Sequence, residues 1–170
     1  MTSKINDRTA VAAETIRDQL RARFDIKPRQ VSVRIHRYSM GSSINVTVKD
    51  PDLDLAPIRE IAEGQQQVRR CEITHDILSG GNLFINAHYS MDALDTRRER
   101  LRAPVESAIA KSREAGDDAM RPVEGTSIKG LFAGWDGRSR QYMATTEADN
   151  HVRDSHDVDG LLHQLAHVSA

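Results

Sequence analysis

Basic and aromatic side chains occupy alternate positions within residues 31–49, where they could form one surface that binds phosphates, bases or a protein partner. Apolar residues alternate with polar ones over residues 31–35 and again over 44–48, which predicts two half-buried strands. Residues 39–42 (Ser-Met-Gly-Ser) between them predict a hairpin loop. The alternation directs the polar side chains to one exposed face, so we predict partner contacts by Arg34, His36, Tyr38, Asn45 and Lys49.

A second basic cluster lies in a segment with helical periodicity. Four arginines fall within residues 97–102, and Glu99 is the only acidic residue among them. Guanidinium groups are planar donors that bind phosphates and carboxylates through paired hydrogen bonds. We therefore add three members of this cluster to the predicted partner-binding residues, namely Arg97, Arg98 and Arg100.

The last helical segment carries a possible metal half-site. Asp159, His163 and His167 follow one another at intervals of four residues, so a helix would align them on one face. Imidazole and carboxylate both bind Zn²⁺. The alternative is that Asp159 and His167 complement the helix dipole from its two ends. No His-Glu-x-x-His pattern and no nearby cysteine supports the metal, so we predict neither a metal nor a cofactor.

The patterns that would indicate an enzyme are missing. Cys71 follows two arginines, which could activate a thiol, but it alternates with Ile73 and is expected to be buried in a strand. His75 follows the same alternation and is expected to be structural. The sequence has no Gly-x-Ser-x-Gly elbow, phosphate loop or dinucleotide fingerprint. We therefore expect a protein that is not an enzyme, with small-molecule substrates disfavoured.

Helices and antiparallel hairpins are expected to position these residues. The order is α-β-β-α-β-β-α, followed by a small β-β-(β)-α unit, which defines an α+β class. Pro104 is expected to kink or divide the third helix, and Asp136-Gly137 to form a two-residue turn. The expected helices cover residues 8–24, 54–64, 91–116 and 158–168, and the paired strands cover 31–35 with 44–48, 68–76 with 83–89, and 128–135 with 138–145.

Composition indicates a globular protein with two parts. Residues 116–127 are rich in acidic and turn residues and are predicted to be a linker between a domain at 1–115 and a small unit at 128–170. No apolar run approaches the ~18 residues that a transmembrane helix requires. We expect no signal peptide and a cytoplasmic location. The single cysteine excludes an internal disulfide framework.

Charge is divided unevenly along the 170 residues, although the net charge is −1. Residues 1–50 contain ten lysines and arginines against five acidic residues, whereas residues 51–170 contain 14 against 20. Such a chain can present a basic surface at near-neutral net charge. The excess of positive charge over the predicted hairpin keeps nucleic acid among the possible partners.

The first half of the chain carries a more specific signature. A helix ends near Phe24, a strand follows, and the hairpin reads Tyr-Ser-Met-Gly-Ser-Ser-Ile from Tyr38, with His-Tyr-Ser at residues 88–90. Residues 8–90 thereby resemble a small domain family found in large polyvalent proteins of phages and conjugative elements. The resemblance implies a mobile-element context and no catalytic residues.

Two functional hypotheses follow. The first is a phage or mobile-element protein that binds and obstructs a host nucleoprotein defence complex in the bacterial cytoplasm, in the manner of an anti-CRISPR or anti-restriction factor. The alternative is an accessory module that binds nucleic acid directly through the basic hairpin face. The steep salt dependence of phosphate contacts would distinguish them.

Overall fold

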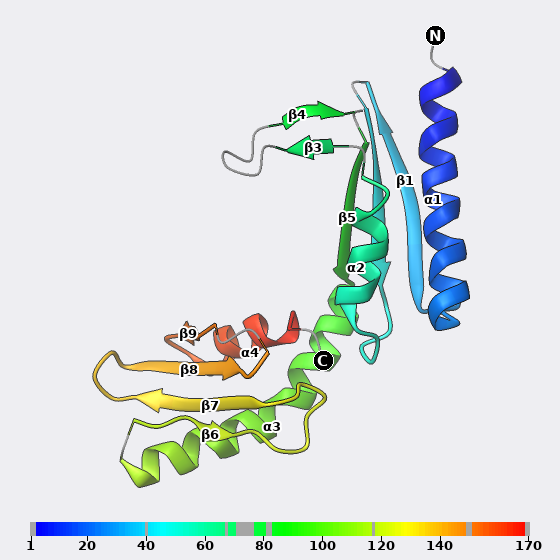
Figure 1. Cartoon of the computed structure of the whole chain (residues 1–170). Helices are drawn as coiled ribbons and strands as arrows, with labels where there is room; N and C mark the ends of the chain where they lie inside the picture. Colours follow the sequence, from blue (N-terminus) through cyan, green and yellow to red (C-terminus); the bar gives the residue numbers. More distant parts are fainter. Residues whose placement is uncertain are drawn as a thin grey trace. The chain divides into compact units, whose positions relative to one another are not determined.

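The computed structural model describes residues 3–39, 41–66, 68–70, 77–80, 83–116, 118–148 and 151–168, without the side chains of 3–7, 68–70 and 77–80. The chain forms two compact units, Met1–Ser90 and Met91–Ala170 (Figure 1). Each combines helices with a sheet, which confirms the α+β class. Among the described residues, no helix is long and apolar enough to cross a membrane.

The first unit is built on a three-stranded sheet, called sheet A, with the strand order β1-β2-β5. A separate two-stranded sheet joins β3 to β4. The elements of this unit are α1 (Ser3–Phe24), β1 (Val31–Tyr38), β2 (Gly41–Val48), α2 (Leu55–Glu63), β3 (Val68–Arg70), β4 (Ile77–Gly80) and β5 (Leu83–Tyr89).

The predicted first hairpin is confirmed. β1 and β2 are antiparallel, and their register pairs Val31 with Val48 and Tyr38 with Gly41. Because side chains alternate across a strand, this register gathers the apolar residues of both strands on one face. Lys49 lies immediately after β2 and is exposed.

The predicted second hairpin is wrong in its pairing. The predicted partner of residues 83–89 was the segment 68–76, of which the structure describes only β3. β3 pairs with β4, whereas β5 lies parallel to β2, with Ser42 opposite Leu83 and Val48 opposite Tyr89. A parallel neighbour requires a crossover connection, which α2 and the residues after it supply. Every second residue of β5 is buried, and these residues extend the apolar face of β2. Cys71, which was expected to be buried in a strand, and His75, which was expected to be structural, lie outside the described residues.

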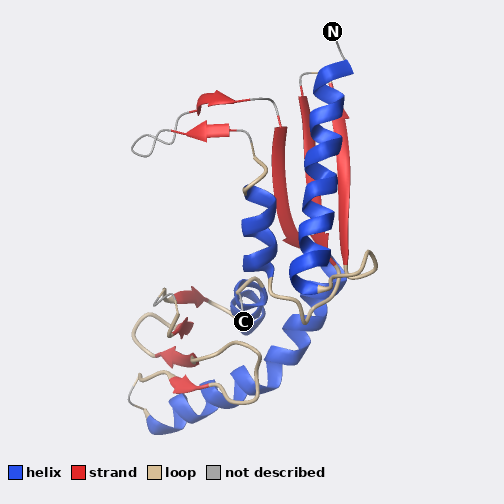
Figure 2. Ribbon diagram, turned by 45° about the vertical axis from the view of Figure 1, so that its right-hand side comes forward, coloured by secondary structure: helices blue, strands red, loops and turns tan. Residues whose placement is uncertain are grey.

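Both helices of this unit pack on that apolar face (Figure 2). The apolar stripe of α1 is buried through Ala13, Ile16 and Leu20, as are Leu55, Ile58 and Ile61 of α2. The Asp54 carboxylate caps α2 by accepting a hydrogen bond from the Ala56 N–H at 3.0 Å, and Gly64 follows its end, in agreement with the helix expected at 54–64. A buried hydroxyl pair, Thr9 Oγ1 and Ser42 Oγ at 2.7 Å, joins α1 to β2.

The second unit places a four-stranded antiparallel sheet, called sheet C, against two helices. Its core consists of buried aliphatic residues from α3, α4 and the central strands, including Val105, Leu131 and Leu161. The elements are α3 (Met91–Ala115), β6 (Arg121–Pro122), β7 (Leu131–Asp136), β8 (Gln141–Thr146), β9 (Arg153–Ser155) and α4 (Val158–Ala166).

The structure decides two local expectations in this unit. Of the two outcomes expected at Pro104, a kink or a division of the helix, the division is wrong, because α3 continues from Met91 to Ala115 and curves along its length in Figure 1. The turn after Asp136 is longer than two residues, since β8 begins only at Gln141. Arg140 adopts the left-handed conformation in this loop, with a φ of 57°.

The boundary between the units falls earlier than the predicted linker. The break comes at Ser90 and Met91, and α3 packs on sheet C and α4. Residues 116–127 are part of the second unit. β6 pairs with β7 inside this segment, and Val123 is buried in the core around α3. Asp118 is also engaged, because its Oδ1 accepts a hydrogen bond from the Gly137 N–H at 3.1 Å.

Candidate binding surface on sheet A

Sheet A has one face packed against helices and one face that presents polar and aromatic side chains, called here the open face. The central strand shows the difference: Ile44 and Val46 are fully buried, whereas Asn45 and Thr47 on the other side are half-exposed. A covered central strand would be buried on both sides. The open face consists of Ser32, Arg34 and His36 on β1, Ser43, Asn45 and Thr47 on β2, and Phe84, Asn86 and His88 on β5.

The strand register arranges these side chains in rows across the sheet. One row joins Arg34, Asn45 and Asn86, and all three offer hydrogen-bonding groups. Arg34 has no ion pair among the described residues. Neighbouring strands lie about 4.8 Å apart, so the row spans roughly 10 Å from β1 to β5. The row therefore offers a guanidinium and two amides to one extended ligand.

The adjacent row joins His36, Ser43 and Phe84. The side chain of Phe84 is 41% exposed, which leaves its ring accessible on the open face. Tyr38 lies next to this row at the end of β1 and is 49% exposed, and its hydroxyl donates to the Ser42 carbonyl at 3.5 Å. Exposed aromatic rings beside an imidazole are typical of surfaces that stack on a partner.

A third row contains a hydroxyl–imidazole pair. Thr47 Oγ1 and His88 Nε2 are 3.3 Å apart, and Ser32 completes the row. A nucleophilic hydroxyl needs a base that a further group orients. The Nδ1 atom of His88 is buried and has no hydrogen-bond partner among the described residues. The pair offers a hydroxyl and an imidazole Nε2 as hydrogen-bonding groups in this row.

The structure brings together most of the predicted hairpin residues and adds a strand that the sequence did not assign to them. Arg34, His36, Tyr38 and Asn45 share the open face or its border. Phe84, Asn86 and His88 were missed. The alternation of buried residues in β5 signals that these three share one face, but nothing in the sequence identifies β2 as the neighbour.

The arginine cluster of α3 is used inside the second unit. Arg97 is 5% exposed, and it donates from Nε to the Ala166 carbonyl at 2.8 Å and from Nη2 to the Val168 carbonyl at 2.6 Å. It thereby satisfies carbonyls at the end of α4 that have no partner within the helix. Arg98 is paired with Asp95. Arg100 is exposed, and it too has an interaction partner.

The acidic member of the proposed metal half-site belongs to the same network. The Arg102 Nη2 atom donates to Asp159 Oδ1 at 2.7 Å, and this hydrogen bond and its charge raise the pKa of Arg102. The rings of His163 and His167 meet edge to face with centroids 5.2 Å apart. Within the described part of the chain, no group of three metal-ligating side chains is close enough to hold an ion.

Comparisons of this chain with family models, with curated proteins and with solved structures give no match. The resemblance of residues 8–90 to the mobile-element family therefore stays a prediction.

Proposed function

We propose that the chain is a non-enzymatic binding protein that holds single-stranded nucleic acid across the open face of sheet A. The observation that carries the proposal is the adjacency of the row Arg34–Asn45–Asn86 to the row that ends in the exposed ring of Phe84. Aromatic rings stack on bases of any identity, amides form hydrogen bonds with base edges, and guanidinium groups bind phosphates. The open face offers all three kinds of contact.

A single strand fits this surface better than a duplex. The face is an open sheet roughly 10 Å wide, and its groups lie along extended strands. Stacking on Phe84 requires a base that has left its own stack, which a single strand supplies without breaking base pairs. The excess of positive charge in residues 1–50 supports a polyanionic ligand.

The resemblance of residues 8–90 supplies a context for this binding. A phage or mobile-element protein that covers an exposed strand of a host nucleoprotein complex would obstruct that complex in the bacterial cytoplasm. Counter-defence of the anti-CRISPR or anti-restriction type is thus the biological role that we propose for the open face, with no cofactor involved.

The test is fluorescence anisotropy of labelled oligothymidine and oligouridine titrated with the full chain. Replacing Phe84 by alanine is expected to weaken binding about tenfold, since one base–aromatic stack is lost. Phe24→Ala is the matched control, because Phe24 is 44% exposed at the end of α1 and lies away from the open face. An equal loss in both variants would contradict the assignment of the face.

A salt series adds an independent readout. Arg34→Ala is expected to reduce the slope of log K against log salt by about 0.7, the value for one phosphate contact on a single strand. Arg23→Ala, which removes an exposed arginine from the last turn of α1, should leave the slope unchanged if Arg23 contacts no phosphate. Absence of binding to either oligonucleotide at ~50 mM salt would reject the nucleic-acid function.

The same variants address the protein-binding hypothesis. If oligonucleotides do not bind but a stoichiometric protein partner is recovered from host lysate, Phe84→Ala should release that partner. A hot-spot truncation typically costs about 2 kcal/mol or more, a loss of roughly thirtyfold. Retention of the partner by this variant would place its contact elsewhere on the molecule.

A further inference from the structure

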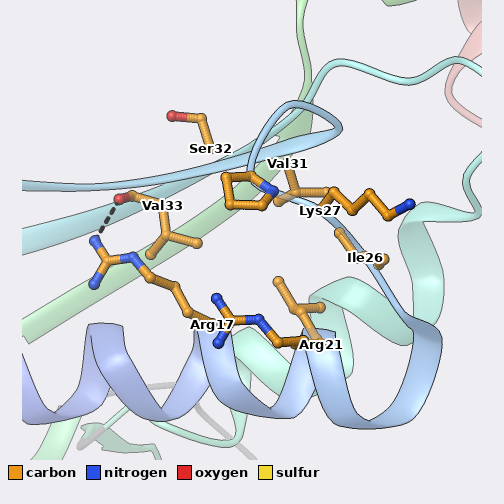
Figure 3. Close-up of a pocket in the computed structure, with 9 residues that line it drawn as sticks. Arg17, Arg21, Ile26, Lys27, Val31, Ser32 and Val33 are labelled. Atoms are coloured by element: carbon orange, nitrogen blue, oxygen red, sulfur yellow. Dashed lines mark hydrogen bonds between the residues drawn. The ribbon is translucent and has the colours of Figure 1, made fainter.

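A groove lies beside sheet A on the side of the sheet that α1 covers, and none of the predicted partner-binding residues lines it. It has a volume of about 210 Å³ and runs between α1 and the edge strand β1 (Figure 3). Its apolar lining includes Leu20 from α1, Ile26 from the connection, and Val31 and Val33 from β1. This composition provides a seat for an aliphatic side chain.

Cationic side chains surround the apolar seat. Figure 3 shows Arg17 extending from α1 toward Val33 of β1 and Arg21 lying along α1 beside it, and Lys27 lies in the connection. No carboxylate is among the described residues that line the groove. Arg21 forms an ion pair with Asp18, whose carboxylate is 3.9 Å away, and both side chains are more than 60% exposed. Such an exposed pair is weak, so the groove remains positive.

The backbone of β1 offers strand-pairing groups along the same groove. β1 is an edge strand of sheet A. The Gln30 carbonyl accepts a hydrogen bond from the Lys49 N–H and so points toward β2. The next backbone groups point the other way: the Val31 N–H donates to the Lys27 carbonyl, and the Val33 carbonyl accepts from the Arg17 guanidinium. In an antiparallel pair the direction alternates from residue to residue. The N–H and C=O groups of Val33 and Ile35 therefore point out of the sheet.

We propose that this edge and groove bind an extended acidic segment of a partner protein, which adds to sheet A as a strand beside β1. The segment would donate a backbone N–H to the Val33 carbonyl and replace the Arg17 guanidinium, which bonds there at 2.7 Å. The released Arg17 then pairs with a carboxylate of the segment, with Arg21 near a second one. Main-chain pairing provides affinity, and alternate side chains provide specificity.

A peptide suits the groove better than a phosphate chain. The edge of β1 presents carbonyl oxygens as well as N–H groups, and these carbonyls accept peptide N–H donors but repel phosphate oxygens. The apolar seat formed by Leu20, Ile26 and Val31 adds a requirement that an anion alone does not meet. Peptide binding at this groove does not depend on nucleic-acid binding at the open face, because the groove is formed by α1, the connection after it and the edge of β1.

The test is fluorescence anisotropy of a labelled synthetic peptide titrated with the full chain. The peptide carries glutamate, valine and glutamate on one strand face and threonines on the other. Three comparison peptides each carry one change. In the first, glutamine replaces glutamate; in the second, the backbone nitrogen of the valine is methylated; in the third, the same residues stand in a scrambled order. Each change is expected to weaken binding about tenfold, since it removes charge-assisted contacts, a ladder hydrogen bond or the seated side chain.

Variants of the chain locate the site. Arg17→Gln with Arg21→Gln should weaken binding of the acidic peptide about tenfold and leave binding of the glutamine peptide unchanged. Arg23→Gln with Arg29→Gln is the matched control, because it removes equal charge from exposed residues that do not line the groove. Circular dichroism confirms that each variant is folded.

Three results would overturn the proposal. They are equal binding of the acidic and the glutamine peptide, an equal loss in both double variants, and unchanged binding of the N-methylated peptide. A different pair of results would assign the groove to nucleic acid instead. Oligothymidine would displace the peptide from the wild-type chain, and the Arg17/Arg21 variant would no longer bind oligothymidine. Failure of oligonucleotide binding with the peptide results intact would reject only the function proposed for the open face.

Discussion

Arg34 of the first unit and three arginines of the second unit have opposite surroundings. In the second unit Arg97 is bonded to carbonyls of α4, Arg102 to Asp159, and Arg113 lies over two aromatic rings. In the first unit Arg34 is exposed on an open sheet face beside Phe84 and has no ion pair among the described residues. The difference shows that an arginine in a basic cluster of the sequence can have its acceptors inside the fold, as Arg97 and Arg102 do. What matters is whether the fold supplies acceptors for them.

The largest expected effect is on Arg97. Its replacement by alanine should lower the free energy of unfolding of the second unit by about 3 kcal/mol, because two carbonyls at the end of α4 lose their donor in a buried site. Urea unfolding followed by the fluorescence of Trp135, the single tryptophan, measures the change. Arg34→Ala should alter the stability by no more than about 0.5 kcal/mol. Equal effects of the two substitutions would break the comparison.

A smaller effect is expected at Arg113. Its guanidinium carbon is 4.5 Å from the centroid of the Trp135 ring, and its Nη2 atom donates to the Tyr142 hydroxyl at 2.9 Å. Because this cluster is partly exposed, Arg113→Ala should cost about 1 kcal/mol in the same unfolding experiment. Lys111→Ala on the same helix, at an exposed position, is the control. A neutral result at Arg113 would place this arginine with the binding residues instead.

The smallest effect concerns pH and the loop after Asp136. The Ser139 hydroxyl donates to Asp136 Oδ2 at 2.6 Å and the Arg138 N–H to Oδ1 at 2.9 Å, and these bonds lower the pKa of Asp136. A lowered pKa in the folded state means that the carboxylate stabilises the fold above the ordinary pKa of about 4 and that this contribution is lost as the pH falls through the lowered value. Ser139→Ala should raise the pKa of Asp136, as measured by carboxyl NMR titration. An unchanged pKa would show that the Arg138 N–H suffices.

Local patterns predicted α1, β1, β2, α2 and β5 of the first unit, but not β4. The stripe on α1, the Asp54 cap and the alternation in β1 and β2 each depend on neighbours within a few residues, so the sequence contains the information. The partner of β5 was not predicted in this way. Alternation determines which residues share a face, but the choice between the segment 68–76 and β2 as the partner of β5 depends on contacts across the crossover through α2.

The candidate site was predicted in the same uneven manner. Arg34 and Asn45 were identified because their strand neighbours are apolar, whereas Phe84 and Asn86 required knowledge of the sheet order. Arg97 looked like a surface cation because its acceptors, the carbonyls of Ala166 and Val168, come about 70 residues later in the chain. Charge patterns in a sequence do not reveal partners at that separation.

The parallel placement of β5 also sets the order in which the first unit can assemble. β1 and β2 are joined by a tight loop and can pair early, whereas β5 starts at Leu83 and must return to β2 after the whole connection has formed. Closing a long loop delays pairing of this kind. During synthesis, the backbone groups of β2 on the side of β5 therefore lack their parallel partner until residues of β5 have left the ribosome. The third of the open face that carries Phe84 is completed last.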